Sequence, residues 1–221
     1  MTSKERVTRL AVDVLVVLAI AWTTFNVGRA VAVGRRVPSQ PYDVVGNPDQ
    51  LAGSGHRLGS SSASILIVVF SDYECGACRD LFARLVPLLE EHDSLGAVVR
   101  HFPVHPNASQ AAVAAECAAK AGRFGNYHQV LFADQARIAE ADWKLFARRA
   151  GVRNQMAFEA CIAEGDASVV VRRDIAAAES LGVAMTPIVV IGHDVYAGLP
   201  WDFEAIVRRH LAMSSQSRGT Q

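Results

Sequence analysis

The sequence has no excess of charge of either sign. Its 221 residues include 22 Lys and Arg against 22 Asp and Glu, so the formal net charge at pH 7 is zero. Because nucleic-acid-binding proteins carry a basic excess, we expect no nucleic-acid partner. Cysteine is also scarce. Four cysteines are too few for a disulfide-dense mini-protein, although an even number is compatible with two pairs.

The sequence also lacks an uninterrupted apolar run of the roughly 20 residues that a membrane-spanning helix requires. The best candidate, residues 10–27, contains Asp13, and its uncharged part covers only residues 14–27. Basic residues flank the run on both sides, so they do not decide its orientation. We expect residues 1–36 to form a single N-terminal transmembrane helix that anchors the protein. The alternative is a secretory signal peptide that is cleaved.

The rest of the chain divides by composition. Residues 37–62 are rich in Pro, Gly and Ser, which predicts a linker. We expect residues 63–213 to form one globular domain and residues 214–221 to form a flexible tail.

The pattern of the globular region predicts an α/β domain. Residues 64–70 and 97–102 are short β-branched runs typical of buried strands, and the helical spacing between them indicates a parallel βαβ unit. Ala-rich and amphipathic segments then predict a helical insertion at about residues 104–181. Two short strands around a turn at residues 192–194 and a helix at residues 201–211 complete a ββα unit.

Cys75 and Cys78 stand two residues apart at the start of the first predicted helix, in "FSDYECGACRDLF". Free backbone N–H groups and the positive end of the helix dipole favour a thiolate there, and the thiolate is the attacking species. Cys75 is the expected exposed nucleophile and Cys78 the resolving cysteine. A zinc site would need a second pair at similar spacing, which Cys117 and Cys161 do not supply, so we expect no metal.

Three stretches together resemble the DsbA-like thiol–disulfide oxidoreductases of the thioredoxin superfamily, particularly their membrane-anchored or secreted bacterial branch. They are the cysteine motif at residues 70–82, "RHFPVHPNASQAAVAAECAA" at residues 100–119 and "LGVAMTPIVVIG" at residues 181–192. The resemblance covers residues 55–211. It implies a thioredoxin-like α/β fold with an inserted helical domain, and thiol–disulfide exchange at Cys75 and Cys78 without a cofactor.

The resemblance also implies roles for other residues. Pro187 is expected to be a cis proline facing the cysteine pair, and a substrate peptide would lie along Thr186 and Pro187 and against the spacer residues Gly76 and Ala77. Cys117 and Cys161 resemble the positions of a second, structural disulfide in some relatives. The alternative is two buried free thiols.

The sequence departs from the family pattern near the cysteines. The spacer lacks the histidine that helps to hold the thiolate in many relatives, and Val69 stands where the family often carries a buried carboxylate. Asp72 and Glu74 are expected to be solvated loop acids that disfavour the thiolate. Three histidines near these segments are interpreted as surface residues: His101, His105 and His128.

The resemblance implies a protein that introduces disulfides into secreted or envelope proteins. Its catalytic domain would lie in the periplasm, anchored to the inner membrane as a single-pass protein, or be secreted after signal cleavage. Expected partners are client proteins with free thiols or disulfides and a reoxidising membrane oxidase, either DsbB-like or vitamin K epoxide reductase-like. We expect a monomer. Two alternatives stay open: a reductase or isomerase, for example in cytochrome maturation, and a non-catalytic chaperone-like binding module.

Overall fold

The computed structural model describes residues 17–18, 20–22, 39–41, 48–182 and 184–218. The chain separates into two units, Met1–Pro38 and Ser39–Gln221. Most of the expected transmembrane segment lies outside the described residues. Among the helices that the structure describes, none has the length and apolar character needed to cross a membrane.

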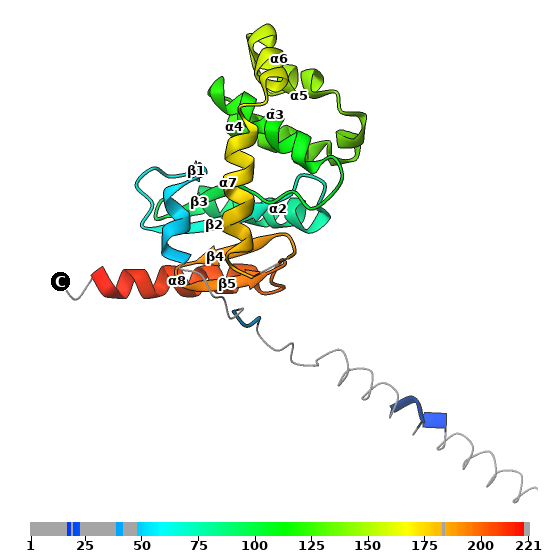
Figure 1. Cartoon of the computed structure of the whole chain (residues 1–221). Helices are drawn as coiled ribbons and strands as arrows, with labels where there is room; N and C mark the ends of the chain where they lie inside the picture. The colour runs from blue at the N-terminus through cyan, green and yellow to red at the C-terminus, as the bar shows by residue number, and fades with distance from the viewer. Residues whose placement is uncertain (1–16, 19, 23–38, 42–47, 183, 219–221) are drawn as a thin grey trace, which may run out of the picture. The chain divides into compact units, whose positions relative to one another are not determined.

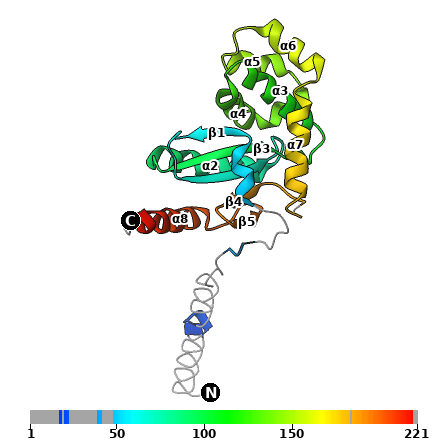
Figure 2. The same ribbon diagram turned by 60° about the vertical axis from the view of Figure 1, so that its left-hand side comes forward.

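The second unit is built on one mixed five-stranded sheet with the order β1-β3-β2-β4-β5. β2 pairs with β3 in parallel, and the other three pairings are antiparallel. The strands are β1 (His56–Gly59), β2 (Ile65–Ser71), β3 (Leu95–His101), β4 (Ile188–Ile191) and β5 (Asp194–Ala197). Figures 1 and 2 show helices on both sides of this sheet. The expected thioredoxin-like α/β fold is therefore confirmed.

The central strand β2 is buried on both faces, as its continuous apolar sequence predicts. Ile67 and Val69 belong to one core cluster, whereas Val68 and Phe70 belong to the other, because successive side chains of a strand point to opposite faces. The first cluster also contains the buried face of α2 (Gly76–Glu91), which connects β2 to the parallel strand β3.

The part of the helical insertion that precedes α7 consists of four α-helices and a short 3-10 helix. They are α3 (Ala108–Lys120), α4 (Phe124–Ala133), η2 (Gln135–Glu140), α5 (Trp143–Arg149) and α6 (Gln155–Glu164). The four α-helices gather at one end of the domain, and α7 (Ser168–Glu179) runs from this group back toward the strands (Figure 1). α8 (Phe203–Arg218) is the last helix.

A buried ion pair fixes α7 against the sheet. Arg100 of β3 donates from Nε and a terminal nitrogen to Oδ1 of Asp174 on α7, at 2.9 and 2.8 Å. The other carboxylate oxygen of Asp174 accepts the backbone N–H of His101 at 3.1 Å. Since Arg100 and Asp174 are both buried, water does not stabilise their charges, and each charge is stabilised by the other.

Two expected boundaries are wrong. Residues 37–62 are not linker throughout, because they contain η1 (Pro48–Gly53) and the edge strand β1. Gly55 lets the chain approach the sheet before β1: its φ is +113°, and a Cβ there would lie 2.6 Å from the Val99 carbonyl oxygen. At the other end, α8 continues through residue 218, so residues 214–218 are helical instead of a flexible tail.

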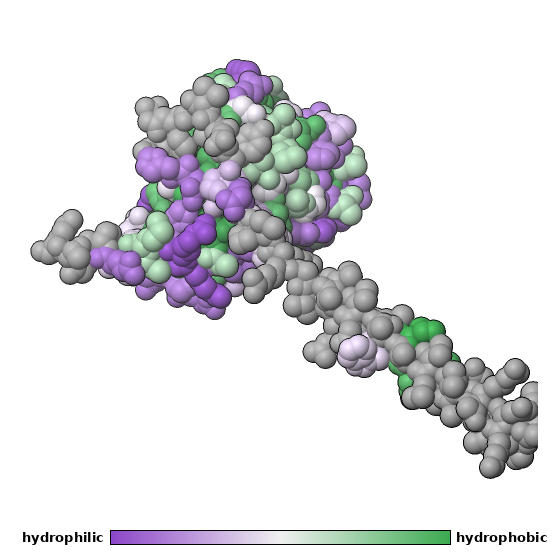
Figure 3. Space-filling model, turned by 90° about the horizontal axis from the view of Figure 1, so that it is seen from below, coloured by the Kyte–Doolittle hydropathy of each residue, from purple (hydrophilic) through white to green (hydrophobic). Residues whose placement is uncertain are grey.

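One face of the surface mixes polar and apolar side chains (Figure 3).

Candidate active site

Cys75 and Cys78 lie at the N-terminus of α2, where β2 delivers the chain to the helix. Cys75 is the N-cap residue, and both cysteines are free thiols. Cys78 is fully buried, and Cys75 is only 8% exposed. The expectation of an exposed nucleophile is therefore correct only in relative terms: Cys75 is the more accessible member of a mostly covered pair.

Four interactions favour the thiolate form of Cys75 and so lower its pKa. The Cys78 thiol makes the largest contribution, followed by the Thr186 side chain and the backbone N–H groups of Cys78 and Ala77. Burial opposes them, yet together they lower the pKa of Cys75 from 9.0 to about 5. Cys75 is therefore a thiolate at neutral pH.

Cys78 has the opposite character. Burial, followed by the hydrogen bond to Cys75, raises the pKa of Cys78 far above its ordinary value, although the Asp72 backbone and the Ser71 hydroxyl partly offset this. The pair consequently holds one proton, and it resides on Cys78. Such a pair has one nucleophile and one protonated partner.

The segment expected to bind substrate lies directly beside Cys75. The Thr186–Pro187 peptide bond is cis, and Cys75 Sγ lies 3.4 Å from the Thr186 carbonyl oxygen. Pro187 is buried, Thr186 is half-buried, and the spacer residues Gly76 and Ala77 are exposed and half-buried. The structure thus brings together all four residues expected to contact substrate.

Asp72 is not the solvated acid that the sequence suggested. It is 1% exposed, and its carboxylate accepts backbone N–H groups from Glu74, Val104 and His105 at 2.7, 2.6 and 2.9 Å. The Glu74 carboxylate accepts two N–H groups of Asn107. Both acids bind the loop before α3, and the main influences on the Cys75 pKa come from other groups.

His105 is a site residue that the sequence reading missed. Its Nδ1 lies 2.9 Å from Oδ2 of Asp72, and its side chain is 45% exposed. The hydrogen bond to Asp72 raises the pKa of His105, and the charges of Cys75 and Glu74 add to this effect. A histidine from another segment is therefore close enough to Cys75 for their charges to interact, although the spacer lacks one. Only its place in the "RHFPVHPNAS" stretch pointed toward the site.

Gln135 of η2 was also missed. Its side-chain nitrogen donates to the carbonyl oxygens of Tyr73 and Cys75, both at 2.9 Å. This contact ties the helical insertion to the loop that carries the nucleophile. No local sequence signal distinguishes this glutamine from a surface residue.

The other two histidines are buried, so their interpretation as surface residues is wrong. His101 is 1% and His128 is 2% exposed. His128 Nδ1 lies 3.1 Å from the hydroxyl of buried Tyr73, and burial lowers the pKa of His128 to about 3, which keeps it neutral.

In the insertion, a disulfide joins Cys117 of α3 to Cys161 of α6.

The sequence of the globular domain is similar to known proteins. The family model described as thioredoxin matches residues 51–208. A curated relative, the Na(+)/H(+) antiporter NhaA 3 of Salinispora tropica, is 31% identical over 154 residues, which are 68% of this chain and 23% of that protein. The NhaA antiporter of Herminiimonas arsenicoxydans is 32% identical over 136 residues, covering 60% of this chain and 21% of that protein. The chain thus spans less than a quarter of the length of these relatives.

Three solved structures resemble the domain. A thioredoxin-like oxidoreductase from Silicibacter pomeroyi has a TM-score of 0.65 at 20% identity, covering 77% of this chain and 99% of that one. ScsC from Proteus mirabilis has a TM-score of 0.66 at 20% identity, with 95% and 97% coverage. The thiol-disulfide exchange protein α-DsbA2 from Wolbachia pipientis has a TM-score of 0.60 at 18% identity, with 71% and 86% coverage. At these identities the similarity establishes a shared fold.

Proposed function

Because the chain belongs to the thioredoxin family and has a DsbA-like fold, we propose that it is an extracytoplasmic protein thiol–disulfide oxidoreductase acting through Cys75 and Cys78. The observation that carries the proposal is the unequal sharing of one proton between two adjacent thiols. Cys75 is a thiolate with a pKa of about 5, and Cys78 keeps its proton in a buried position. Thiol–disulfide exchange requires this pairing of a nucleophile with a resolving thiol.

We propose that the protein works in the oxidising direction. A client thiolate attacks Sγ of Cys75 in the Cys75–Cys78 disulfide, the bond between the two cysteines breaks, and Cys78 leaves with the electron pair and takes up a proton. A second client thiolate then attacks the client sulfur of the mixed disulfide and releases Cys75 as a thiolate. The client has gained a disulfide, and the protein has become a dithiol.

The acidity of Cys75 supports this direction. A thiolate stabilised in the reduced protein makes reduction of the protein favourable, and a low-pKa thiol also leaves faster from the mixed disulfide. The client backbone would lie along Thr186 and Pro187, beside the sulfur, with the exposed spacer residue Gly76 leaving room on the other side.

The proposed setting is the periplasm. One similar solved structure, from Salmonella enterica, is described as a periplasmic thioredoxin-like protein, and a Cys117–Cys161 disulfide suits an oxidising compartment. We further propose that residues 1–36 attach the domain to the inner membrane, that the protein is a monomer, and that a DsbB-like or vitamin K epoxide reductase-like oxidase regenerates the disulfide. Ion transport is not proposed, because the match covers only 23% of the first antiporter.

The test runs the reaction in both directions. Oxidised protein is mixed with a reduced peptide containing two cysteines, and reduced protein with the same peptide in its disulfide form. We expect efficient oxidation of the dithiol peptide, little reduction of the disulfide peptide, and loss of both reactions in Cys75→Ser. Preferential reduction would favour the reductase or isomerase alternative. No exchange in either direction would favour the non-catalytic binding module.

A further inference from the structure

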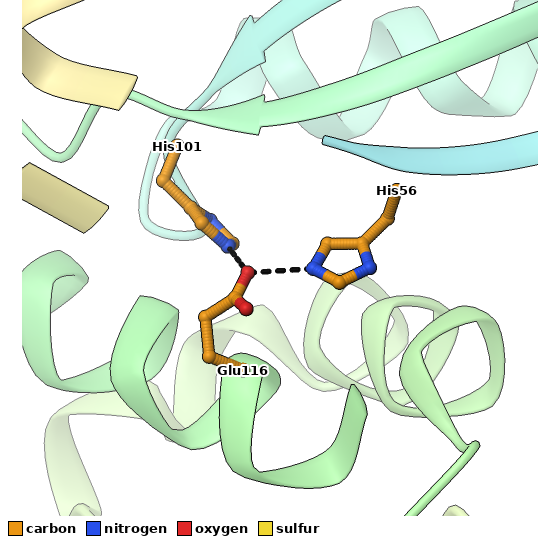
Figure 4. A group of neighbouring side chains, drawn as sticks. All are labelled: His56, His101 and Glu116. Carbon is orange, nitrogen blue, oxygen red and sulfur yellow. Dashed lines mark hydrogen bonds and ion pairs between the residues drawn. The ribbon is translucent and has the colours of Figure 1, made fainter. Parts of the chain in front are cut away.

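Three side chains from three separate elements converge at a point that thiol exchange does not use. They are His56 of β1, His101 at the end of β3 and Glu116 of α3 (Figure 4). Nε2 of His56 and Nε2 of His101 lie 2.6 and 2.7 Å from Oε1 of Glu116. One potential ligand atom from each residue lies within 4.8 Å of the other two.

The two imidazoles aim at the same carboxylate oxygen (Figure 4). Each carboxylate oxygen has two lone pairs, so both rings can hydrogen-bond Oε1 while the cluster holds no ion. The three potential ligand atoms are also close enough together to share one cation. Phe124 stacks on His56 with ring centroids 3.7 Å apart, which holds that ring in place.

We propose that His56, His101 and Glu116 form a binding site for a divalent transition metal of the zinc class. Two imidazole nitrogens and one carboxylate oxygen are a donor set that zinc uses when it keeps a fourth position open, and imidazole also suits copper and nickel. No local sequence pattern marks this site, because His56 lies in the segment expected to be linker.

The charge of the cluster suits a cation. Glu116 supplies one carboxylate, and each imidazole supplies a ring nitrogen within hydrogen-bond distance of its Oε1. Each ring must present an Nε2 without its proton, so binding releases protons or moves them to Nδ1.

The geometry needs only a small adjustment. Zinc–nitrogen and zinc–oxygen distances of about 2.0–2.2 Å in a tetrahedron separate neighbouring ligand atoms by about 3.3 Å. The two observed separations must therefore widen by about 0.6–0.7 Å. A rotation of the Glu116 side chain would widen both separations, and His56 can adjust with it because it lies on the edge strand β1 and its side chain is 25% exposed. The ion and a solvent ligand would enter from this side.

A bound ion would brace the helical insertion against the sheet. Glu116 precedes Cys117, which is already joined to α6 by a disulfide, so α3 would be held on both sides. The site also lies near the cysteines. The ring centroids of His101 and Tyr73 are 6.0 Å apart, and Tyr73 is two residues before Cys75. The site would therefore strengthen the contact between the two parts of the domain.

The test is a Zn²⁺ titration of the full-length oxidised protein, in which both cysteine pairs are disulfides and offer no thiolate. We expect one Zn²⁺ per chain by calorimetry and, with Co²⁺, the visible bands of a four-coordinate site. Glu116→Gln and His56→Gln should each weaken binding by at least ~30-fold, since loss of even an outer-shell partner costs about 10–100-fold. His92→Gln, which changes a partly exposed histidine outside the cluster, is the matched control and should bind like the wild type.

Two results would overturn the proposal. One is the absence of stoichiometric Zn²⁺ binding. The other is binding that survives both substitutions, which would place the ion elsewhere. Circular dichroism without metal checks that the variants fold, and His56→Gln, at the sheet edge, keeps the test valid if Glu116→Gln does not fold. The outcome is independent of thiol exchange, because the oxidised protein is used throughout.

Discussion

Cys75 Sγ lies 3.4 Å from the carbonyl oxygen of Thr186, although 111 residues separate them in the chain. The contact joins the two halves of the thioredoxin fold, because Cys75 begins the helix after β2 and Thr186 precedes β4. A nucleophile and the backbone that would hold its client thus meet at one point. The proposed exchange reaction requires this proximity.

The reactivity of Cys75 should depend on pH as a group with a pKa of about 5. In reduced protein, the rate of alkylation by iodoacetamide should rise between about pH 4 and pH 6 and be nearly constant above pH 7, because the thiolate is the reacting species. Mass spectrometry should locate the label on Cys75. A rate that still rises at pH 8–9 would show an ordinary thiol.

The same pKa predicts how the stability of the reduced protein depends on pH. The folded-state pKa of Cys75 is lowered from 9.0 to about 5, so its contribution is complete above pH 9 and is lost as the pH falls to about 5. Urea unfolding of the reduced and oxidised proteins across this range measures the effect. The oxidised protein is the control, since its disulfide does not titrate; identical profiles for the two forms would contradict the prediction.

Replacing His105 with glutamine should raise the pKa of Cys75, because the variant keeps a donor for Asp72 but loses the positive charge near the thiolate. The change should be less than about one pKa unit, since an exposed ion pair contributes about 0.2–1 kcal/mol. The alkylation profile measures it. His92→Gln, remote from the cysteines in sequence and paired with Glu91, should leave the profile unchanged. Equal shifts in both variants would argue against a specific role for His105.

Asp174→Ala should destabilise the domain by about 3–5 kcal/mol, because it leaves the buried guanidinium of Arg100 without its partner. Chemical denaturation gives the free energy of unfolding. The matched control is Glu140→Ala, which removes the exposed partner of Arg137 and should leave the stability almost unchanged. A similar loss in both variants would show that the α7 ion pair has no special importance.

The sequence predicted the parts of the fold that have a regular local pattern. The β-branched runs at β2 and β3 and the helical spacing between them are local, and the structure confirms the unit that they form. β1 was missed because "HRLG" is only four residues long and shows no strand alternation. It is a strand because β3 offers it an edge with which to pair, which is a property of the whole sheet.

The same distinction applies to the candidate site. The spacing of Cys75 and Cys78 at a helix start is local, and the structure places them there. The contacts that shape the site are long-range: Asp72 binds a loop 33 residues away, and Gln135 reaches back 60 residues to Cys75. A single sequence does not reveal which polar residues will meet after folding.

A mixed disulfide trapped on Cys75 would show directly that this cysteine carries out thiol–disulfide exchange. Reduced Cys78→Ser protein is incubated with a client of two peptides joined by one disulfide. The Cys75 thiolate should attack it, form a bond to one peptide and release the other as a thiol, and no Cys78 thiol would remain to resolve the product. We predict one peptide adduct per chain, located on Cys75 by mass spectrometry and removed by dithiothreitol. No adduct, or an adduct on another cysteine, would contradict the account.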